Sequence, residues 1–266
     1  MPYRDTPPVL DAPAVLLCAG LDPSAGAGLL ADARLATILG CRPVGVATAL
    51  TEQNSLAVVA ANPVDPDTVG GQLSTLLSDV EVVAIKLGML GSAGTAHAVA
   101  DAFALTVAPV VWDPVLRPTR GDVPLFDGDP RQAVELLAPH LTLITPNADE
   151  AGLLTGTRVV DEASAVAAAE ALRARGVPAV LVKGGHLTGE EAVDLLVTGD
   201  GVVALRGPRV QLPEPVHGTG CALSTAIACL LARGRALPDA CAEAKEIVAE
   251  RLRGPVRAGR GRPSVM

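Results

Sequence analysis

Aromatic residues are almost absent from this sequence, which holds two phenylalanines, one tyrosine and one tryptophan in 266 residues. Hydrophobic residues nevertheless make up 49% of the chain, so its core has to be built from alanine, valine and leucine. Small aliphatic side chains of this kind are the usual filling of a parallel sheet covered by helices. The length is sufficient for one large α/β domain or two small ones.

The features of membrane and nucleic-acid-binding proteins are also missing. No run approaches the ~18 uninterrupted apolar residues of a transmembrane helix. The formal net charge of −8 argues against nucleic acid as a partner over any broad surface. Residues 1–13 contain Arg4, Asp5 and several prolines, which is unlike a signal peptide. We therefore expect a cytoplasmic protein with no membrane partner and no nucleic-acid partner.

The five cysteines lack the spacing of a zinc site or a disulfide framework. They are odd in number, form no CxxC pair and lie mostly in apolar segments, at Cys18, Cys41, Cys221, Cys229 and Cys241. This pattern favours reduced thiols in a cytoplasmic protein.

Two nucleotide-binding motifs are absent or misplaced. The sequence has no GxxxxGK[ST], which excludes a P-loop fold. Gly26-Ala-Gly28-Leu-Leu-Ala31 matches the GxGxxA pattern of dinucleotide-binding folds, but six residues separate Gly26 from the expected strand end near Ala19. In those folds the first glycine follows the strand at once. We interpret these glycines as positions where a loop and a helix pack closely over a small substrate.

Short apolar runs alternate with helical patterns along the chain. Strands are expected at 14–19, 44–49, 56–61, 82–87, 109–112, 141–145 and 179–182. Helices are expected at 27–39, 65–78, 92–105, 161–175, 219–233 and 238–252, with a shorter one after Asn147. Residues 193–197 and 202–205 are typical of a hairpin at a sheet edge. This order predicts a doubly wound, mostly parallel central α/β sheet flanked by helices, with a small edge hairpin.

No repeat, low-complexity block or linker divides the chain, so we expect one domain over residues 14–253. Residues 1–13 are expected to be a disordered N-terminal segment. Residues 254–266, rich in glycine, arginine and proline, are expected to form a flexible tail.

Unusual polar residues stand at or just past the ends of the expected strands. They are Asp22, Gln53, Asn54, residues 86–89, Asp113, Asn147, Glu150 and Lys183. Ligands of doubly wound sheets bind outside the carboxyl ends of the strands. We therefore expect these residues to converge on one crevice.

Lysine is scarce, with three residues against eighteen arginines. A lysine at a strand end in such a chain suggests that a compact point charge is needed there. Lys183, which precedes two glycines, could bridge transferring phosphates. An exposed lysine placed by chance is the other interpretation.

Asn147 and Glu150 lie three residues apart and hence on one face of a helical turn. Glu150 could hold a Mg²⁺-bound water and Asn147 a phosphate-side ligand. The same spacing is that of a helix N-cap with a capping carboxylate, and spacing alone favours the cap.

Residues 217–221, His-Gly-Thr-Gly-Cys, stand where the helix 219–233 begins. A helix start offers free N–H groups and the positive end of the dipole, and glycines let an anion approach the backbone. The same field would stabilise a thiolate at Cys221, whereas apolar surroundings would raise its pKa. An anion hole beside a titratable group suits phosphoryl transfer. An ordinary glycine-rich loop with a packing cysteine is the other interpretation.

Seven segments resemble, in the expected order, hydroxymethylpyrimidine/phosphomethylpyrimidine kinases, the thiamine-pathway branch of the ribokinase-like superfamily. They are residues 19–32, 48–54, 86–90, 113–115, 144–147, 182–186 and 217–224, and the resemblance runs from about residue 15 to about 251. Cys221 after Gly-Thr-Gly is especially specific, since most ribokinase-like enzymes have aspartate there.

The resemblance implies a kinase that uses ATP and Mg²⁺ to phosphorylate 4-amino-5-hydroxymethyl-2-methylpyrimidine and then its monophosphate. Gly218, Thr219 and Gly220 would form the anion hole, and Cys221 would stand beside the acceptor. ATP phosphates would be bound by Thr219, Lys183, Asn147, Glu150 and Asp113, with Glu150 and Asp113 also serving Mg²⁺. The pyrimidine pocket would be lined by Gly20, Asp32, Gln53, Gly88, Met89 and Val115.

Three features depart from the family pattern, at Leu21, Leu30 and residues 117–121. The last of them leaves the efficiency of the second phosphorylation open. A pyridoxal kinase would share the fold and the Gly-Thr-Gly-Cys sequence, so only a substrate assay separates it. A non-catalytic pyrimidine-binding regulator should lose Lys183 or the glycines, and this chain keeps both. We expect a homodimer, although the sequence does not fix the oligomeric state.

Overall fold

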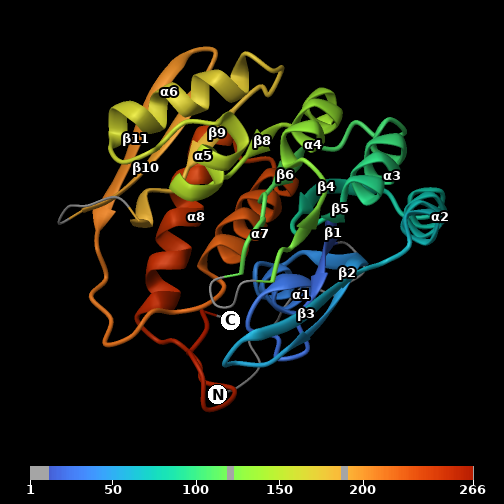
Figure 1. Cartoon of the computed structure of the whole chain (residues 1–266), viewed down its shortest axis with the longest axis horizontal. Coiled ribbons are helices and arrows are strands. Elements are labelled where there is room, and N and C mark those ends of the chain that lie inside the picture. Colours follow the sequence, from blue (N-terminus) through green and yellow to red (C-terminus); the bar gives the residue numbers. More distant parts are fainter. Residues whose placement is uncertain (1–11, 119–122, 187–190, 266) are drawn as a thin grey trace.

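The computed structural model describes residues 12–118, 123–186 and 191–265. Its central sheet has nine strands in the order β11-β10-β9-β8-β6-β4-β1-β2-β3 (Figure 1). The strands are β1 (Ala14–Leu21), β2 (Arg42–Gln53), β3 (Val58–Pro63), β4 (Val82–Leu87), β6 (Val110–Trp112), β8 (Leu143–Ile144), β9 (Val180–Val182), β10 (Glu191–Thr198) and β11 (Gly201–Pro208). Neighbours from β2 to β9 pair in parallel, whereas β3, β10 and β11 pair antiparallel at the edges. The predicted mostly parallel sheet and its edge hairpin are confirmed.

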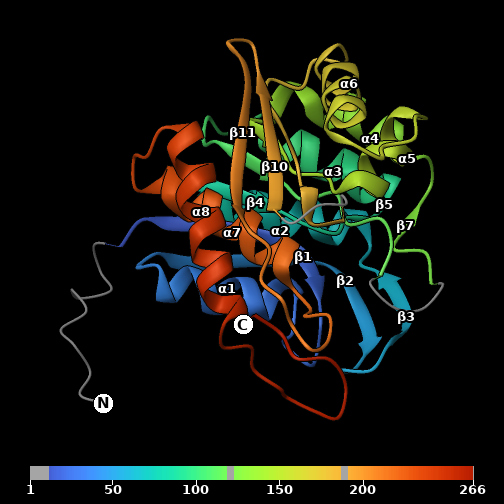
Figure 2. The same cartoon turned by 90° about the vertical axis from the view of Figure 1, so that its left-hand side faces the viewer.

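Helices cover both faces of the sheet (Figures 1 and 2). One face carries α1 (Gly28–Ile38), α7 (Thr219–Ala232) and α8 (Leu237–Leu252). The other carries α2 (Pro66–Leu77), α3 (Ala93–Phe103), α4 (Pro130–Leu137), α5 (Ala148–Thr155) and α6 (Glu162–Arg173). Side chains of β1 alternate between the two layers: Val15 and Leu17 pack under α1 and α7, and Leu16 and Cys18 face the other layer. A strand buried on both faces is continuously apolar, as the sequence of β1 is.

Two elements differ from the sequence prediction in extent. β2 continues to Gln53 instead of ending at residue 49, because its second half pairs with β3. The helix α4 was not predicted, although Asp129 caps it and Pro130 opens it. A further small sheet pairs β5 (Gly91–Ser92) with β7 (Phe126–Asp127).

The C-terminal residues, expected as a flexible tail, are packed in the described part of the chain. Val265 is 3% exposed, and its backbone N–H donates to the carbonyl of His217. The amide of Val256 donates to the carbonyl of Ser264, which closes the segment on itself. Gly259 and Gly261 let the backbone of this segment lie close to Ser55, and Pro263 and Val265 share backbone hydrogen bonds with His217.

Residues 1–11 of the expected N-terminal segment and residues 119–121 of the variant loop lie outside the described residues. None of the helices in the described part of the chain combines the length and apolar character that a membrane crossing requires.

Candidate active site

A cavity of about 1420 Å³ opens beyond the carboxyl ends of the parallel strands. Its walls include most of the residues singled out in the sequence: Gly20, Gln53, Met89, Asp113, Val115, Asn147, Glu150, Lys183, Gly218, Thr219, Gly220 and Cys221. Segments from six strand ends and from the start of α7 thus meet at one place. The predicted convergence on one crevice is confirmed.

Asp32 and Gly88, expected to line the pyrimidine pocket, are not part of the cavity wall. Asp32 is fully buried on α1, where its carboxylate pairs with Lys86 Nζ at 2.5 Å and accepts from Thr225 Oγ1 at 2.9 Å. A Cβ at Gly88 would lie 2.7 Å from the same Nζ, so glycine leaves room for the lysine. Both residues therefore support Lys86, which is itself one of the residues that border the cavity.

The start of α7 has the geometry of an anion site. Gly218 stands at the N-cap with φ +83°, and no side chain caps the first turn. A Cβ there would lie 2.3 Å from the carbonyl oxygen of Gly26, so only glycine fits between the two loops. The first-turn N–H groups and the positive end of the dipole face the cavity at Thr219 and Gly220.

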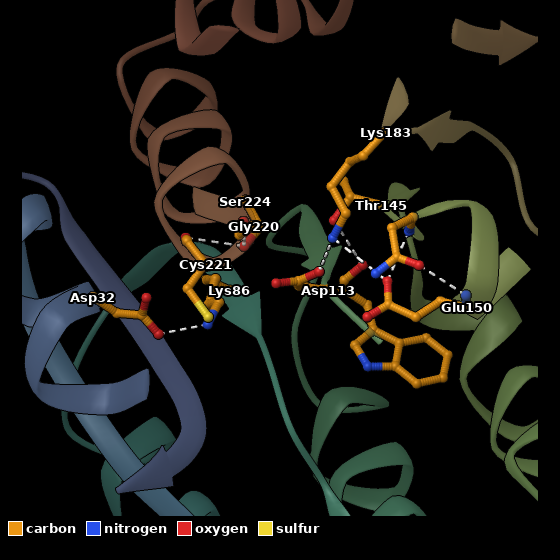
Figure 3. Close-up of polar contacts among 11 residues, drawn as sticks. Asp32, Lys86, Asp113, Thr145, Glu150, Lys183, Gly220, Cys221 and Ser224 are labelled. Carbon is orange, nitrogen blue, oxygen red and sulfur yellow. Dashed lines mark hydrogen bonds and ion pairs between the residues drawn. The ribbon is translucent and has the colours of Figure 1, made fainter. Parts of the chain in front are cut away.

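Lys183 lies among carboxylates at the same end of the cavity. Its Nζ is 2.5 Å from Asp113 Oδ1 and 3.6 Å from Glu150 Oε2 (Figure 3). Burial opposes the ammonium charge, but Asp113 and Glu150 hold the pKa of Lys183 above its usual value. A Cβ at Gly220 would lie 3.1 Å from that Nζ, so the lysine also stands against the start of α7. Lys183 is not an exposed lysine placed by chance.

Asn147 and Glu150 form the helix cap that their spacing favours. The Asn147 side chain accepts from the Glu150 amide at 2.9 Å, and Glu150 Oε2 accepts from the Asn147 amide at 2.7 Å. The Glu150 carboxylate still lies on the cavity wall next to Lys183. Burial raises its pKa to about 7, while Lys183 acts in the opposite direction. The cap and a role in ligand binding are therefore compatible.

Cys221 lies in the first turn of α7 and is the one partly exposed cysteine of the five, all of which are free thiols. Burial of its thiol raises the pKa to about 12, although Lys86 acts in the opposite direction. The expected lowering of this pKa by the helix start is thus outweighed by the loss of solvent. Any thiolate at Cys221 depends on nearby positive charge.

Three wall residues were missed as site candidates by sequence reasoning. Lys86 was expected at the crevice as part of residues 86–89, but it was given no role there. His217 precedes the Gly-Thr-Gly-Cys sequence, and its Nε2 lies 3.9 Å from Asp22 Oδ2. Arg262 comes from the C-terminal segment and carried no signal, because nothing local indicates that this segment returns to the cavity.

Comparison with known proteins gives a consistent result. Residues 22–266 match the model of the phosphomethylpyrimidine kinase family. The chain is 43% identical to a hydroxymethylpyrimidine/phosphomethylpyrimidine kinase of Streptomyces coelicolor over 91% of this chain and 89% of that protein. It is 40% identical to a bifunctional thiamine biosynthesis protein of Geobacter sulfurreducens over 93% of this chain and 50% of that protein. Among solved structures, a Bacillus subtilis pyridoxal kinase in complex with ADP is similar, with a TM-score of 0.85, 30% identity and 96% of both chains covered.

Proposed function

The chain belongs to the phosphomethylpyrimidine kinase family, and we propose that its cavity is where a phosphoryl group passes from ATP to hydroxymethylpyrimidine and to its monophosphate. The protein is thus a phosphotransferase of thiamine biosynthesis. The observation that carries the proposal is the meeting of an uncapped glycine-rich helix start with lysines and carboxylates in one cavity. Catalysis of phosphoryl transfer is mostly positioning and electrostatic stabilisation, which these groups supply.

At the phosphate end, the N–H groups of Gly218, Thr219 and Gly220 would hold the transferring phosphoryl group. Two observations support this role of the N–H groups: the N-cap Gly218 has a left-handed backbone, and no side chain caps the first turn. Lys183 would exchange part of its contact with Asp113 for phosphate oxygens and neutralise charge there. Asn147 and Glu150 border the same space from the start of α5.

Asp113 and Glu150 fit a magnesium site of the kind that nucleotide kinases use. No cluster of three or more histidine, cysteine or acidic side chains suited to a metal occurs among the described residues. Mg²⁺ is commonly held by one or two carboxylates together with substrate phosphates and water, so two carboxylates suffice. When bound, the ion would neutralise charge on the phosphates. Lys183 pairs with both carboxylates and keeps them at this end of the cavity.

At the other end, Gly20, Gln53, Met89 and Val115 would enclose the pyrimidine ring. Met89 Sδ lies 3.0 Å from the position of a Cβ on Gly20, so glycine at this position lets the methionine pack against β1. The Gln53 amide can donate and accept at once, which matches the edge of an aminopyrimidine.

An ATP-consumption assay with the hydroxymethylpyrimidine, its monophosphate and pyridoxal side by side tests the proposal. Pyridoxal is included because of the similarity to the Bacillus subtilis pyridoxal kinase. We expect Mg²⁺-dependent turnover of both pyrimidines and weaker turnover of pyridoxal. Cys221→Ala should keep ATP binding and lower kcat roughly 10²-fold, the upper range of general acid–base catalysis being about 10⁴-fold. Pyrimidine binding without a phosphorylated product would instead support a regulator, and preferred turnover of pyridoxal a pyridoxal kinase.

We also propose that the protein acts in the cytoplasm as a homodimer. The support for the compartment is that all five cysteines are free thiols. The support for the dimer is a group of exposed apolar side chains around the β2–β3 hairpin, at Leu50, Leu56 and Val59.

A further inference from the structure

Lys86 is a fully buried lysine near the end of β4 and one of the residues that border the cavity. Its ammonium is fixed by Asp32 at 2.5 Å, and Asp32 is fixed in turn by Thr225 at 2.9 Å. These three residues come from β4, α1 and α7, so packing of the whole layer sets their positions. Figure 3 shows the Lys86 ammonium beside the Cys221 sulfur and joined by a dashed line to Asp32.

The charged groups that act on Cys221 come from β4, from α1 and from the residues after β6 and β9, and they differ in sign. Lys86 on β4 favours a thiolate, whereas Asp32 on α1 and Asp113 after β6 oppose it. The backbone N–H of Gly28, at the start of α1, also favours the charged sulfur. Lys86 is therefore the main cation that offsets the burial of this sulfur, and Lys183 on the cavity wall also interacts with it.

We propose that Lys86 is a positioning residue that acts as the counter-charge of the Cys221 thiolate, with Asp32 holding it in place. The proposal rests on the kinase function. In the transfer step the acceptor O–H bond breaks and the Cys221 sulfur takes the proton. The acceptor oxygen forms its bond to the γ-phosphorus while the bond between the γ-phosphorus and the bridging oxygen breaks, and ADP leaves with that electron pair. Lys86 makes the step possible by supporting the thiolate that receives the proton.

The rate of alkylation of Cys221 by iodoacetamide, followed from pH 7 to 10, tests this role. The other four cysteines are buried and serve as an internal background. Lys86→Met should slow alkylation about tenfold or more at each pH, since one pKa unit changes the thiolate fraction tenfold. Asp32→Asn should accelerate it, because the asparagine oxygen can still accept from the Lys86 ammonium while the negative charge that opposes the thiolate is removed. kcat should fall at least tenfold in Lys86→Met, with the KM for ATP little changed.

The two substitutions in this ion pair should change the alkylation rate in opposite directions, and this difference separates an electrostatic role from a structural one. A purely structural pair would loosen the site in both variants and change the alkylation rate in the same direction, which would overturn the proposal. Lys245→Met is the matched control. Lys245 Nζ lies 2.6 Å from Asp194 Oδ2, and neither residue belongs to the cavity wall. It should leave the alkylation rate unchanged. If Lys86→Met does not fold, the change in the alkylation rate of Asp32→Asn decides. Slower or unchanged alkylation of that variant contradicts the proposal.

A second inference comes from the C-terminal segment. The amides of Gly261 and Arg262 donate to the Ser55 Oγ and carbonyl oxygen at 3.0 and 3.1 Å, and the amide of His217 donates to the Pro263 carbonyl at 2.8 Å. A Cβ at Gly261 would lie 1.9 Å from the Ser55 carbonyl oxygen, so the segment is seated closely. These contacts carry the Arg262 side chain to the cavity wall beside His217.

Three buried side-chain nitrogens have no hydrogen-bond partner among the described residues: Trp112 Nε1, His217 Nε2 and Arg262 Nε. His217 and Arg262 belong to the wall of the same cavity, and His217 directly precedes Gly218 in the sequence. Arg262 Nε can only donate, and a buried donor without an acceptor is costly. Both residues border the cavity, and the acceptor that best satisfies an arginine there is a phosphate or a carboxylate.

We infer that Arg262 and His217 bind the phosphate group of the pyrimidine monophosphate, which makes Arg262 a specificity-determining residue for the second phosphorylation. This inference rests on the kinase function. Because ATP also brings phosphates to the cavity, the experiment has to distinguish the two sources.

Steady-state kinetics of Arg262→Met with the alcohol and with the monophosphate make that distinction. We expect kcat/KM for the monophosphate to fall at least tenfold, kcat/KM for the alcohol to stay within about threefold, and the KM for ATP to stay unchanged. Arg260→Met is the control, since Arg260 is exposed in the same segment and absent from the cavity wall. Equal losses with both substrates, a raised KM for ATP, or unchanged monophosphate kinetics would each overturn the inference. Failure of the wild-type protein to turn over either substrate would instead refute the kinase function.

Discussion

Lys183 shows at the residue scale how one charge serves two states of the site. In the structure it pairs with Asp113 and Glu150, and in the proposed reaction it neutralises the transferring phosphoryl group. Lys183→Ala should lower kcat on the order of 10²-fold or more, as expected for loss of a preorganised electrostatic contact. Pyrimidine binding, measured by calorimetry, should change far less. Lys183→Arg should not restore full activity, because a planar guanidinium does not replace a compact ammonium between two carboxylates.

Lys245→Ala is the control for that experiment, since Lys245 also forms a close ion pair with an aspartate but lies away from the cavity wall. Similar losses of kcat in the two alanine variants would mean that Lys183 acts through stability alone.

Glu150 links the pH dependence of stability to its burial, which raises its pKa from 4.5 to about 7. Between these values the folded protein keeps a proton on Glu150 that the unfolded chain has released. Stability therefore falls as pH rises from 4.5 to 7, because folding has to bury the charge. Glu150→Gln should remove this loss of stability, and its side-chain oxygen can still accept from the backbone N–H of Asn147. Urea denaturation at pH 5 and pH 7, without Mg²⁺ and nucleotide, measures the difference.

The same variant tests the metal. If Glu150 holds Mg²⁺ through water, Glu150→Gln should also raise the Mg²⁺ concentration needed for half-maximal rate. Parallel pH dependence in wild type and variant would show that Glu150 does not titrate in this window, and an unchanged Mg²⁺ requirement would leave it a helix cap only.

At the scale of secondary-structure elements, the sequence predicted those helices and strands whose positions depend on neighbouring residues alone. The continuous apolar run of β1 and the cap at Asn147 were predictable because neighbouring residues alone specify them. The length of β2 was not, since its second half depends on pairing with β3. The helix α4 was missed despite the Asp129-Pro130 start, because its eight residues include only a short apolar stripe.

Helix α7 offers a test of geometry at its two ends, where Gly218 and Gly234 both have positive φ. Gly218→Ala should destabilise the protein and abolish most activity, because its Cβ would meet the Gly26 carbonyl oxygen at 2.3 Å. Gly234 has open space, so Gly234→Ala should cost only about 1–2 kcal/mol for the left-handed backbone. Thermal unfolding and kcat of both variants provide the measurement. Equal effects at the two ends would show that backbone conformation, and not the contact with the Gly26 loop, is what matters.

For the whole molecule, the sequence predicted the architecture and the edge of the sheet that holds the cavity, because alternation and strand direction specify both. It misplaced Asp32, which the family resemblance put in the pocket wall. The Asp32 carboxylate instead forms a buried ion pair with Lys86, which lies 54 positions away in the chain. It also missed Arg262, which reaches the cavity only because the C-terminal segment docks on Ser55 and His217. Contacts between distant segments decide these positions, and composition does not reveal them.

The two edges of the central sheet allow a test of the proposed dimer. Val59 on β3 is 66% exposed, Leu56 in the β2–β3 turn 46% and Leu50 on β2 49%. An edge strand ordinarily avoids such a concentration of apolar surface unless it is covered. A second copy of this chain would cover it, so Val59→Glu should convert the dimer into a monomer in light scattering. Val203→Glu is the matched control, because Val203 is 44% exposed on the opposite edge strand β11. A monomeric wild type would refute the dimer, and dissociation by Val203→Glu alone would move the interface to β11.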